Sequence, residues 1–205
     1  PTLVNNVETL VNVLSIVKDG GAAYAALGTE GSKGRKLFCL SGAVAKPGIY
    51  EVEFGITLRQ LIELGGGMRG GSTMQAILLG GAAGGFVGPN DLDLPLTMEA
   101  TRAAGSSLGS GVVMVLDQSV DMVDQLRRIA AFFRDESCGQ CVPCRVGTVR
   151  QEEIVSRLAK GVQSQDIELL RELGTVMRDA SICGLGQTAN SAIDSAINKL
   201  KVFAV

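Results

Sequence analysis

The chain has 205 residues, of which 46% are hydrophobic, and it carries a formal net charge of −2 with no histidine. This weakly acidic balance argues against nucleic acid or an anionic membrane surface as a partner. The absence of histidine excludes every metal site and catalytic pair that needs an imidazole. The longest weakly polar stretch, residues 76–88, is too short and too glycine-rich for a membrane span. We therefore expect no direct membrane insertion.

Residues 1–34 are predicted to form a helical connecting segment. Between Val4 and Val17, apolar residues recur at helical spacing. A glycine pair at 20–21 interrupts this helix, and the composition of residues 28–34 is typical of a loop. Because the chain begins at Pro1, in what reads as mid-domain sequence, we expect it to be a fragment of a longer protein.

Residues 35–117 are predicted to form an α+β unit that resembles the β-grasp fold. It starts with a hairpin: a strand over 37–44, a turn at Pro47-Gly48, and a strand over 49–54 in which apolar residues alternate with glutamates. Thr57 and Gln60 form a capping box at the start of a short helix, which Gly65 ends. Further strands are predicted over 74–79 and 112–116.

Two features of this unit invite a functional interpretation. The glycine clusters at 65–71 and 80–85 loosely match phosphate-binding loops, but neither has a P-loop lysine nor opens a convincing helix, so tight turns are favoured. Cys39 lies in the apolar run of the first strand. We expect Cys39 to be a small buried core residue without chemistry.

Residues 118–205 are predicted to be a helical bundle. Ser119 is the expected cap of its first helix, whose buried side includes Val123 and Phe133. Three further helices are predicted over about 146–158, after Ser164, and over 189–200. We expect this bundle to hold a metal centre between two of its loops.

Four of the five cysteines predict that metal centre. Cys138, Cys141 and Cys144 are spaced as C-x2-C-x2-C, and Cys183 follows in a separate segment. Close spacing wraps a short loop around three irons of a [4Fe-4S] cubane, and a remote cysteine binds the fourth. This pattern indicates a protein that carries an electron.

Three other interpretations of these cysteines are less favoured. Buried core cysteines rarely occur by chance at this spacing beside glycine and proline. A disulfide framework is typical of small secreted proteins, whereas this chain has an odd number of cysteines and no secretory signal. A structural zinc site within a non-redox interaction module stays open as the alternative, although zinc sites usually pair two C-x2-C knuckles.

The chain also resembles the C-terminal part of the NADH-binding flavoprotein subunit (51 kDa type) of respiratory complex I and its relatives in NAD-linked hydrogenases and formate dehydrogenases. The cysteine motif in residues 136–147 carries the resemblance most specifically. The segment 1–10 is similar to the family's exit from the flavin domain, and Ser41-Gly42 with Pro47-Gly48 is similar to its soluble-ligand-binding domain. These motifs do not distinguish the respiratory, hydrogenase and formate dehydrogenase versions.

The resemblance implies a function, cofactors and partners. In the family, NADH passes a hydride to FMN, and single electrons leave through a [4Fe-4S] cluster to clusters in a thioredoxin-like [2Fe-2S] subunit and a multi-cluster subunit. By the motif match, the ligands of that [4Fe-4S] cluster are Cys138, Cys141, Cys144 and Cys183. The expected location is the cytoplasm, or the cytoplasmic face of the inner membrane where the complex is attached to it.

The same resemblance places Asn5, Asn6 and Thr9 near the flavin. The alternative is that they are ordinary polar residues at a helix start. The glycine-rich flavin- and nucleotide-binding region of the family precedes this segment and is absent from these 205 residues. We therefore expect the isolated chain to hold the cluster but to be inactive with NADH.

Overall fold

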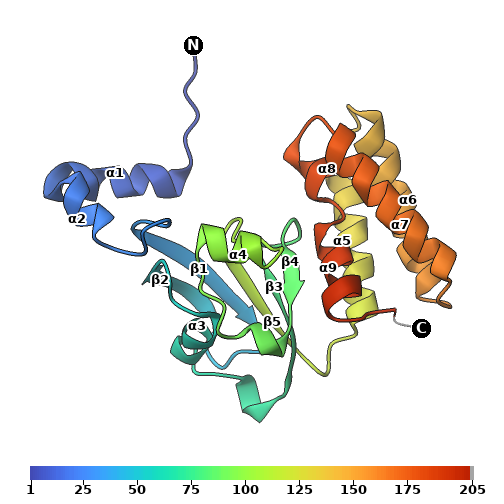
Figure 1. Cartoon of the computed structure of the whole chain (residues 1–205), viewed down its shortest axis with the longest axis horizontal. Coiled ribbons are helices and arrows are strands. Elements are labelled where there is room, and N and C mark those ends of the chain that lie inside the picture. Colours follow the sequence, from blue (N-terminus) through green and yellow to red (C-terminus); the bar gives the residue numbers. More distant parts are fainter. Residues whose placement is uncertain (204–205) are drawn as a thin grey trace.

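A computed structural model describes residues 1–203, in which helices flank and extend a single mixed sheet (Figure 1). The N-terminal part of the chain contains α1 (Val7–Asp19), α2 (Gly21–Ala25), β1 (Arg35–Gly42), β2 (Gly48–Glu53) and α3 (Leu58–Leu64). The middle contains the 3-10 helices η1 (Arg69–Gly71) and η2 (Pro89–Asp91), with β3 (Met74–Leu79), β4 (Gly85–Val87), α4 (Met98–Ala103) and β5 (Val112–Asp117). The C-terminal part contains α5 (Met122–Glu136), α6 (Val142–Leu158), α7 (Ser164–Ala180), α8 (Gly184–Thr188) and α9 (Ser191–Lys199).

The sheet has the order β2-β1-β5-β3-β4. β1 and β2 form an antiparallel hairpin in which Arg35 is opposite Glu53. β5 then returns to lie parallel to β1, with Cys39 opposite Val112. A parallel pair needs a crossover connection, and residues 43–111, which include β2, supply it. The predicted α+β architecture with a β-grasp-like sheet is confirmed.

Helix α3 covers one face of this sheet. Its predicted capping box is present: the Thr57 hydroxyl accepts from the Gln60 N–H, and the Gln60 side chain accepts from the Thr57 N–H. The cap fixes where the helix begins, and its apolar side then packs on Phe38 and Leu40 of β1. Leu58, Leu61 and Ile62 are the buried residues of α3.

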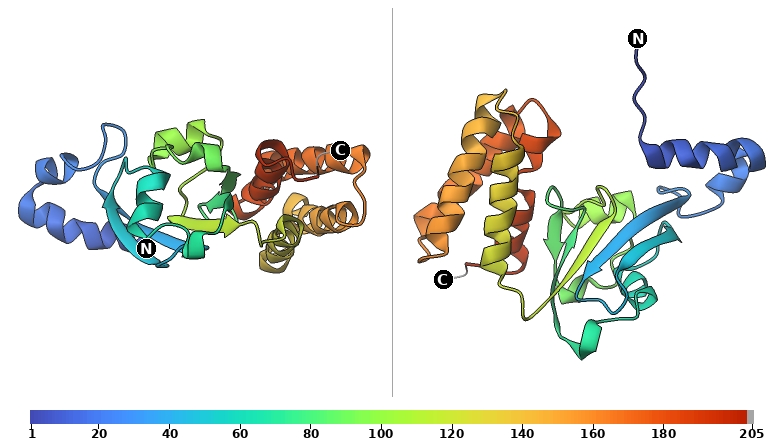
Figure 2. Two further views of the ribbon diagram at one scale, coloured as in Figure 1. Left: turned by 90° about the horizontal axis from the view of Figure 1, so that it is seen from below. Right: turned by 180° about the vertical axis from the view of Figure 1, so that it is seen from behind.

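The helical bundle packs against the β3, β4 and β5 end of the sheet, and α1 lies beyond the β1 and β2 end (Figures 1 and 2). One apolar core joins Leu78 and Phe86 of the sheet to Leu126 of α5 and Ile193 of α9. A buried hydrogen bond of 2.7 Å from the Phe86 N–H to the Ser195 hydroxyl adds a polar link. The bundle is therefore anchored on the sheet.

The bundle helices begin at other residues than the sequence predicted. The cap of α5 is Asp121, whose carboxylate accepts from the N–H groups of Val123 and Asp124, so the prediction of Ser119 was wrong. The Ser119 hydroxyl donates instead to the Asp117 carboxylate. Helix α6 begins at Val142 rather than near 146. The short helices α2, α4 and α8 and the strand β4 were not predicted from the sequence.

The prediction that Cys39 is a buried core residue was also wrong. Cys39 is exposed, while its neighbours Phe38 and Leu40 are almost completely buried. Successive side chains of a strand point to opposite faces. Phe38 and Leu40 face α3, so Cys39 between them points to the other face. The bundle covers the opposite face only over β3 to β5, which leaves Cys39 of β1 uncovered.

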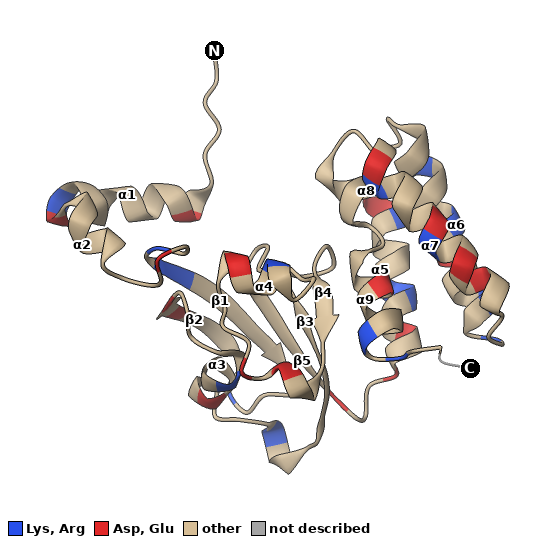
Figure 3. Ribbon diagram, in the orientation of Figure 1, with Lys and Arg blue, Asp and Glu red and all other residues tan. Residues whose placement is uncertain are grey.

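Charged residues of both signs are spread over α5, α6 and α7, whereas α1 carries few of them (Figure 3). Several form ion pairs on the helix surfaces, such as Arg128 with Asp124 and Arg157 with Asp166. Within residues 1–203, no helix has the length and apolar character that crossing a membrane requires.

Candidate metal centre

Four cysteines from two separate segments line one cavity of about 270 Å³. Cys138 and Cys141 lie in the connection between α5 and α6, and Cys144 lies in the first turn of α6. Cys183 precedes α8. The fold therefore brings the remote cysteine to the three that are close in sequence. One of the four thiols lies in a helix, although the sequence predicted two loops.

Two helix N-termini meet at this cavity. Cys141 is the N-cap residue of α6 and Cys183 is the N-cap residue of α8, and neither cap is satisfied by a side chain. The backbone N–H groups at a helix start favour negative charge nearby. For Cys141 the backbone N–H groups of Ile182 and then Cys144 lower the pKa of the thiol. Both effects favour thiolates, which are the form that binds metal.

The loop that carries the first two cysteines is held by its own side chains. Gly139 adopts a φ of 73°, a left-handed conformation that favours glycine. Its carbonyl accepts from the Arg145 guanidinium at 3.2 Å, and its N–H donates to the Ser137 hydroxyl at 3.3 Å. Arg145 thus ties the loop to α6, whereas three other arginines near the motif form ion pairs with carboxylates: Arg128, Arg134 and Arg150.

The segment that carries Cys183 is held against α6 by close packing. Gly186 of α8 lies so near Ser181 and Cys144 that a β-carbon there would be 2.3 Å from the Ser181 Oγ and 2.9 Å from the Cys144 Cβ. The Gln187 side chain donates to the Ser181 carbonyl at 3.0 Å. These contacts set the separation of Cys183 from the other three cysteines.

The cavity suits a cluster better than a single ion. A tetrahedral zinc site would bring its four sulfurs to within about 3.8 Å of one another. Among residues 1–203, no three cysteine or carboxylate residues converge closely enough to hold one metal ion. The buried Ser181 hydroxyl, which packs with Cys144 around Gly186, also has no hydrogen-bond partner among the described residues, and such an orphaned polar group beside the cysteines is consistent with an absent ligand. The residues present therefore fit an iron–sulfur cluster.

Asn5, Asn6 and Thr9 lie far from this centre. They are exposed at the start of α1, at the opposite end of the molecule from α8 (Figures 1 and 2). The Asn6 side chain caps α1 by accepting from the Thr9 N–H at 3.3 Å. The helix-start role considered from the sequence is therefore realised for Asn6.

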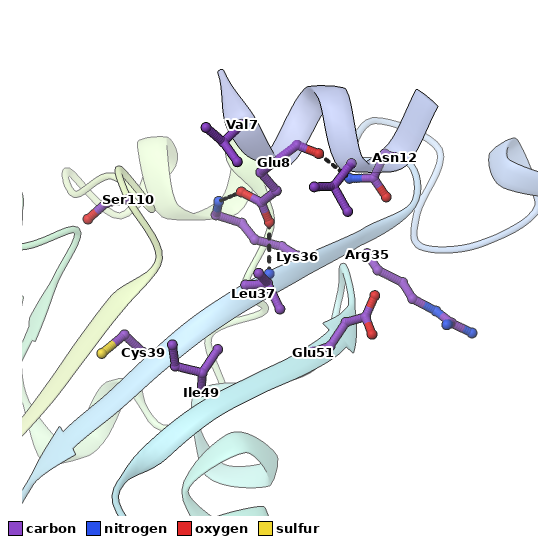
Figure 4. Close-up of a pocket in the computed structure, with 11 residues that line it drawn as sticks. Val7, Glu8, Asn12, Arg35, Lys36, Leu37, Cys39, Ile49, Glu51 and Ser110 are labelled. Carbon is purple, nitrogen blue, oxygen red and sulfur yellow. Dashed lines mark hydrogen bonds and ion pairs between the residues drawn. The ribbon is translucent and has the colours of Figure 1, made fainter. Parts of the chain in front are cut away.

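A second cavity, of about 500 Å³, lies between α1 and the β1–β2 hairpin. Figure 4 shows Glu8 at its rim, where the carboxylate accepts from the Lys36 ammonium at 2.9 Å and from the Leu37 N–H at 2.8 Å. The exposed Cys39 and Ile49 also line it. Both carboxylate oxygens of Glu8 are engaged, so Glu8 serves to attach α1 to the sheet.

Three residues of the metal centre were missed from the sequence. Ser137 and Ser181 each lie one or two positions before a cysteine, and Gly186 lies three positions after one. Serine next to cysteine is the only local signal, and it does not reveal which hydroxyl faces a sulfur. Their contacts depend on how α6 and α8 pack.

Two family models match parts of this chain. Residues 124–202 match the NADH-ubiquinone oxidoreductase-F iron-sulfur binding region, and residues 37–85 match the SLBB domain. Residues 124–202 are thus similar to this iron-sulfur binding region, called the F-type region below. The first match contains all four cysteines of the cavity, and the second covers most of the hairpin, α3 and β3.

Relatives of the F-type region align along nearly the whole chain. The NADP-reducing hydrogenase subunit HndC of Solidesulfovibrio fructosivorans is 39% identical over 97% of this chain and 41% of its own length. The F-type subunit of the NADH-quinone oxidoreductase of Mycobacterium bovis is 39% identical over 98% of this chain and 45% of its own length. The chain thus spans less than half of these relatives.

A solved structure shares the fold. The crystal structure of an NAD+-reducing [NiFe]-hydrogenase in the H2-reduced state superposes with a TM-score of 0.88 at 39% sequence identity, covering 99% of this chain and 34% of that chain. This similarity extends from α1 to the bundle. The resemblance inferred from the sequence is confirmed.

Proposed function

We propose that Cys138, Cys141, Cys144 and Cys183 ligate one [4Fe-4S] cluster and that the chain is the electron-transfer portion of an NADH-oxidising flavoprotein subunit. The observation that carries the proposal is the cavity at which all four thiols meet, inside an F-type iron–sulfur region. When bound, the cluster supplies a one-electron carrier. The protein supplies the thiolates and the groups that stabilise them.

The exposure of the cysteines suits exchange of electrons with a neighbour. Cys144 is buried on α6, whereas Cys138 and Cys183 are exposed. The site therefore has one side in the bundle core and one side at the surface. The buried side keeps water from the cluster, and the exposed side is where a partner's redox centre would approach.

The remaining parts of the proposal concern cofactors and partners. FMN and NAD would bind to a longer form of the subunit, with Asn5, Asn6 and Thr9 contributing to the flavin site. Electrons would pass on to a thioredoxin-like [2Fe-2S] subunit and a multi-cluster iron–sulfur subunit of one complex. The complex would lie in the cytoplasm or against the inner face of the membrane. The multi-subunit enzymes named among the relatives support these proposals.

Metal analysis tests the cluster directly. The chain, purified without oxygen, should contain about four iron and four acid-labile sulfide per molecule. It should show the broad visible absorption of an iron–sulfur protein and a reduced-state EPR signal. One zinc per chain with no sulfide would instead support a structural zinc site in a non-redox interaction module.

Activity assays test the flavin part separately. The 205-residue polypeptide should be reduced by dithionite but not by NADH, even with added FMN. Its three candidate flavin contacts are exposed side chains, and each hydrogen bond would contribute only about 0.5–1.5 kcal/mol. Rapid NADH oxidation by this polypeptide would show that the nucleotide site has been misplaced.

A further inference from the structure

Two serine hydroxyls lie beside cysteine side chains, one from each segment of the candidate metal centre. Ser137 precedes the three-cysteine run, and its Oγ is 3.3 Å from the Cys144 Sγ. Ser181 precedes Cys183 and lies beside Cys144 and Gly186. Neither hydroxyl is needed to cap a helix.

The hydrogen bonds around Ser137 determine where its proton points. Its oxygen accepts from the Gly139 N–H at 3.3 Å, which leaves the hydroxyl proton for the Cys144 sulfur. A metal-bound cysteine is a thiolate and has no proton to give. In the loaded site the hydroxyl must therefore be the donor of this contact.

Ser181 is the more constrained of the two. Its side chain is only 6% exposed, and its Oγ has no hydrogen-bond partner among the described residues. Gly186 packs against it, so the hydroxyl has no room to reach water on that side. A buried hydroxyl without a partner is costly. The cysteine thiolates of the loaded site, of which Cys144 packs beside the same glycine, would supply the acceptor.

We infer that Ser137 and Ser181 are tuning residues, whose hydroxyls donate to cysteine sulfurs of the centre, that of Ser137 to the Cys144 sulfur, and raise the reduction potential of the bound cluster. A hydrogen bond to a ligand sulfur withdraws negative charge, and the reduced cluster, with one more electron, gains more from it than the oxidised cluster. The inference rests on the proposed cluster ligation. It goes beyond that proposal because it assigns a role in setting the cluster's reduction potential to two residues that bind no iron.

Redox titration of the anaerobically purified chain, followed by EPR, tests the inference. The variants are Ser137→Ala, Ser181→Ala and the double variant. Each single variant should shift the midpoint potential downward, and the double variant should shift it further. Thr188→Ala is the matched control, because the Thr188 hydroxyl lies on α8 and donates to the Gly184 carbonyl at 2.7 Å. Its potential should equal that of the wild type.

The outcomes separate this inference from the proposed function. A wild-type chain without iron and sulfide would overturn the cluster itself, and with it the inference. A full cluster whose potential is the same in the wild type and in both serine variants would overturn only the inference. A shift of equal size in Thr188→Ala would also overturn it, because a general loosening of α8 would then explain the change.

A measurement on the wild type covers the case in which a serine variant fails to assemble its cluster. Hydroxyl protons exchange with D2O faster than buried backbone amide protons. Brief exchange should therefore add deuterium couplings to the pulsed EPR spectrum of the reduced cluster that are stronger than those of solvent at the exposed side of the site. Absence of these couplings would overturn the inference.

Discussion

Gly186 and Ser181 are in contact at the metal centre, and no side chain fits between them. A β-carbon on Gly186 would lie 2.3 Å from the Ser181 Oγ and 2.6 Å from its Cβ. The same β-carbon would lie 2.9 Å from the Cys144 Cβ, so α8, with Cys183 at its start, packs directly on α6. The position of Cys183 thus depends on Gly186, which is not itself a candidate metal ligand.

Gly186→Ala is expected to weaken metal binding. The added methyl group must displace either Ser181 or the Cys144 side chain, and overpacking of this kind costs about 1–3 kcal/mol. Iron and sulfide content should fall to well below half of the wild-type value. Gly184→Ala is the matched control, since a β-carbon on Gly184 meets nothing within 4 Å. Equal metal content in the two variants would show that the contact does not matter.

Cys183→Ala should remove the EPR signal of the intact cluster, whereas Cys39→Ala should preserve it. Cys183 lines the metal cavity and Cys39 lies on β1, beside the cavity under α1. The measurement is iron content together with the reduced-state EPR signal. Equal loss in both variants would contradict the assignment of Cys183 as the fourth ligand.

Ser195→Ala is expected to destabilise the junction between the sheet and the bundle. The Ser195 hydroxyl accepts from the buried Phe86 N–H, and an unsatisfied buried donor costs about 1–3 kcal/mol. Urea unfolding should show this loss of stability. Ser191→Ala, at the partly exposed start of the same helix, should change stability by less than about 0.5 kcal/mol. Similar unfolding midpoints for the two variants would rule out this role of Ser195.

The Glu8 carboxylate should make the attachment of α1 dependent on pH. Partial burial would raise its pKa, but the hydrogen bonds from Leu37 and Lys36 and the charge of Lys36 together hold the pKa of Glu8 below its usual value. A lowered folded-state pKa stabilises the attachment above the ordinary glutamate value and loses that effect as pH falls through the lowered value. The contact is therefore present at neutral pH and weakens in acid.

Hydrogen exchange of the α1 amides measures this effect. At pH 7, the α1 amides of the Glu8→Gln variant should exchange faster than those of the wild type, since the substitution removes the charge that pairs with Lys36. At the acidic end of a pH series, where the wild-type carboxyl is also protonated, the difference should shrink. Glu30→Gln, in an exposed loop, should match the wild type at both pH values. A difference that persists unchanged in acid would contradict the role of the charge.

The cysteine spacing and the local capping signals could be interpreted from the sequence because they depend on neighbours in the chain. Cys138, Cys141 and Cys144 lie within seven residues, so a short loop brings them together regardless of the rest of the fold. The capping box of Thr57 and Gln60 likewise needs only one helical turn. These predictions concerned contacts between residues a few positions apart.

The burial of individual residues depended on which elements cover them. The alternation in β1 does not by itself show which set of side chains faces the core, and Cys39 is on the uncovered side because the bundle reaches only β3 to β5. The sequence also did not decide which residue caps α5, since both Ser119 and Asp121 can cap a helix. Ser119 instead bonds to Asp117 at the end of β5.

By itself, the sequence determined which four cysteines are the candidate ligands of one metal centre, since cysteine type and spacing already predict a ligand set. Only the tertiary structure decided what surrounds them. Gly186 and Ser181 belong to a different segment from Cys144, and they meet it because α8 packs on α6. Packing of helices distant in sequence depends on the shapes of many side chains at once. For that reason the cysteine ligands can be predicted from the sequence, whereas the serine hydroxyls that pack beside them cannot.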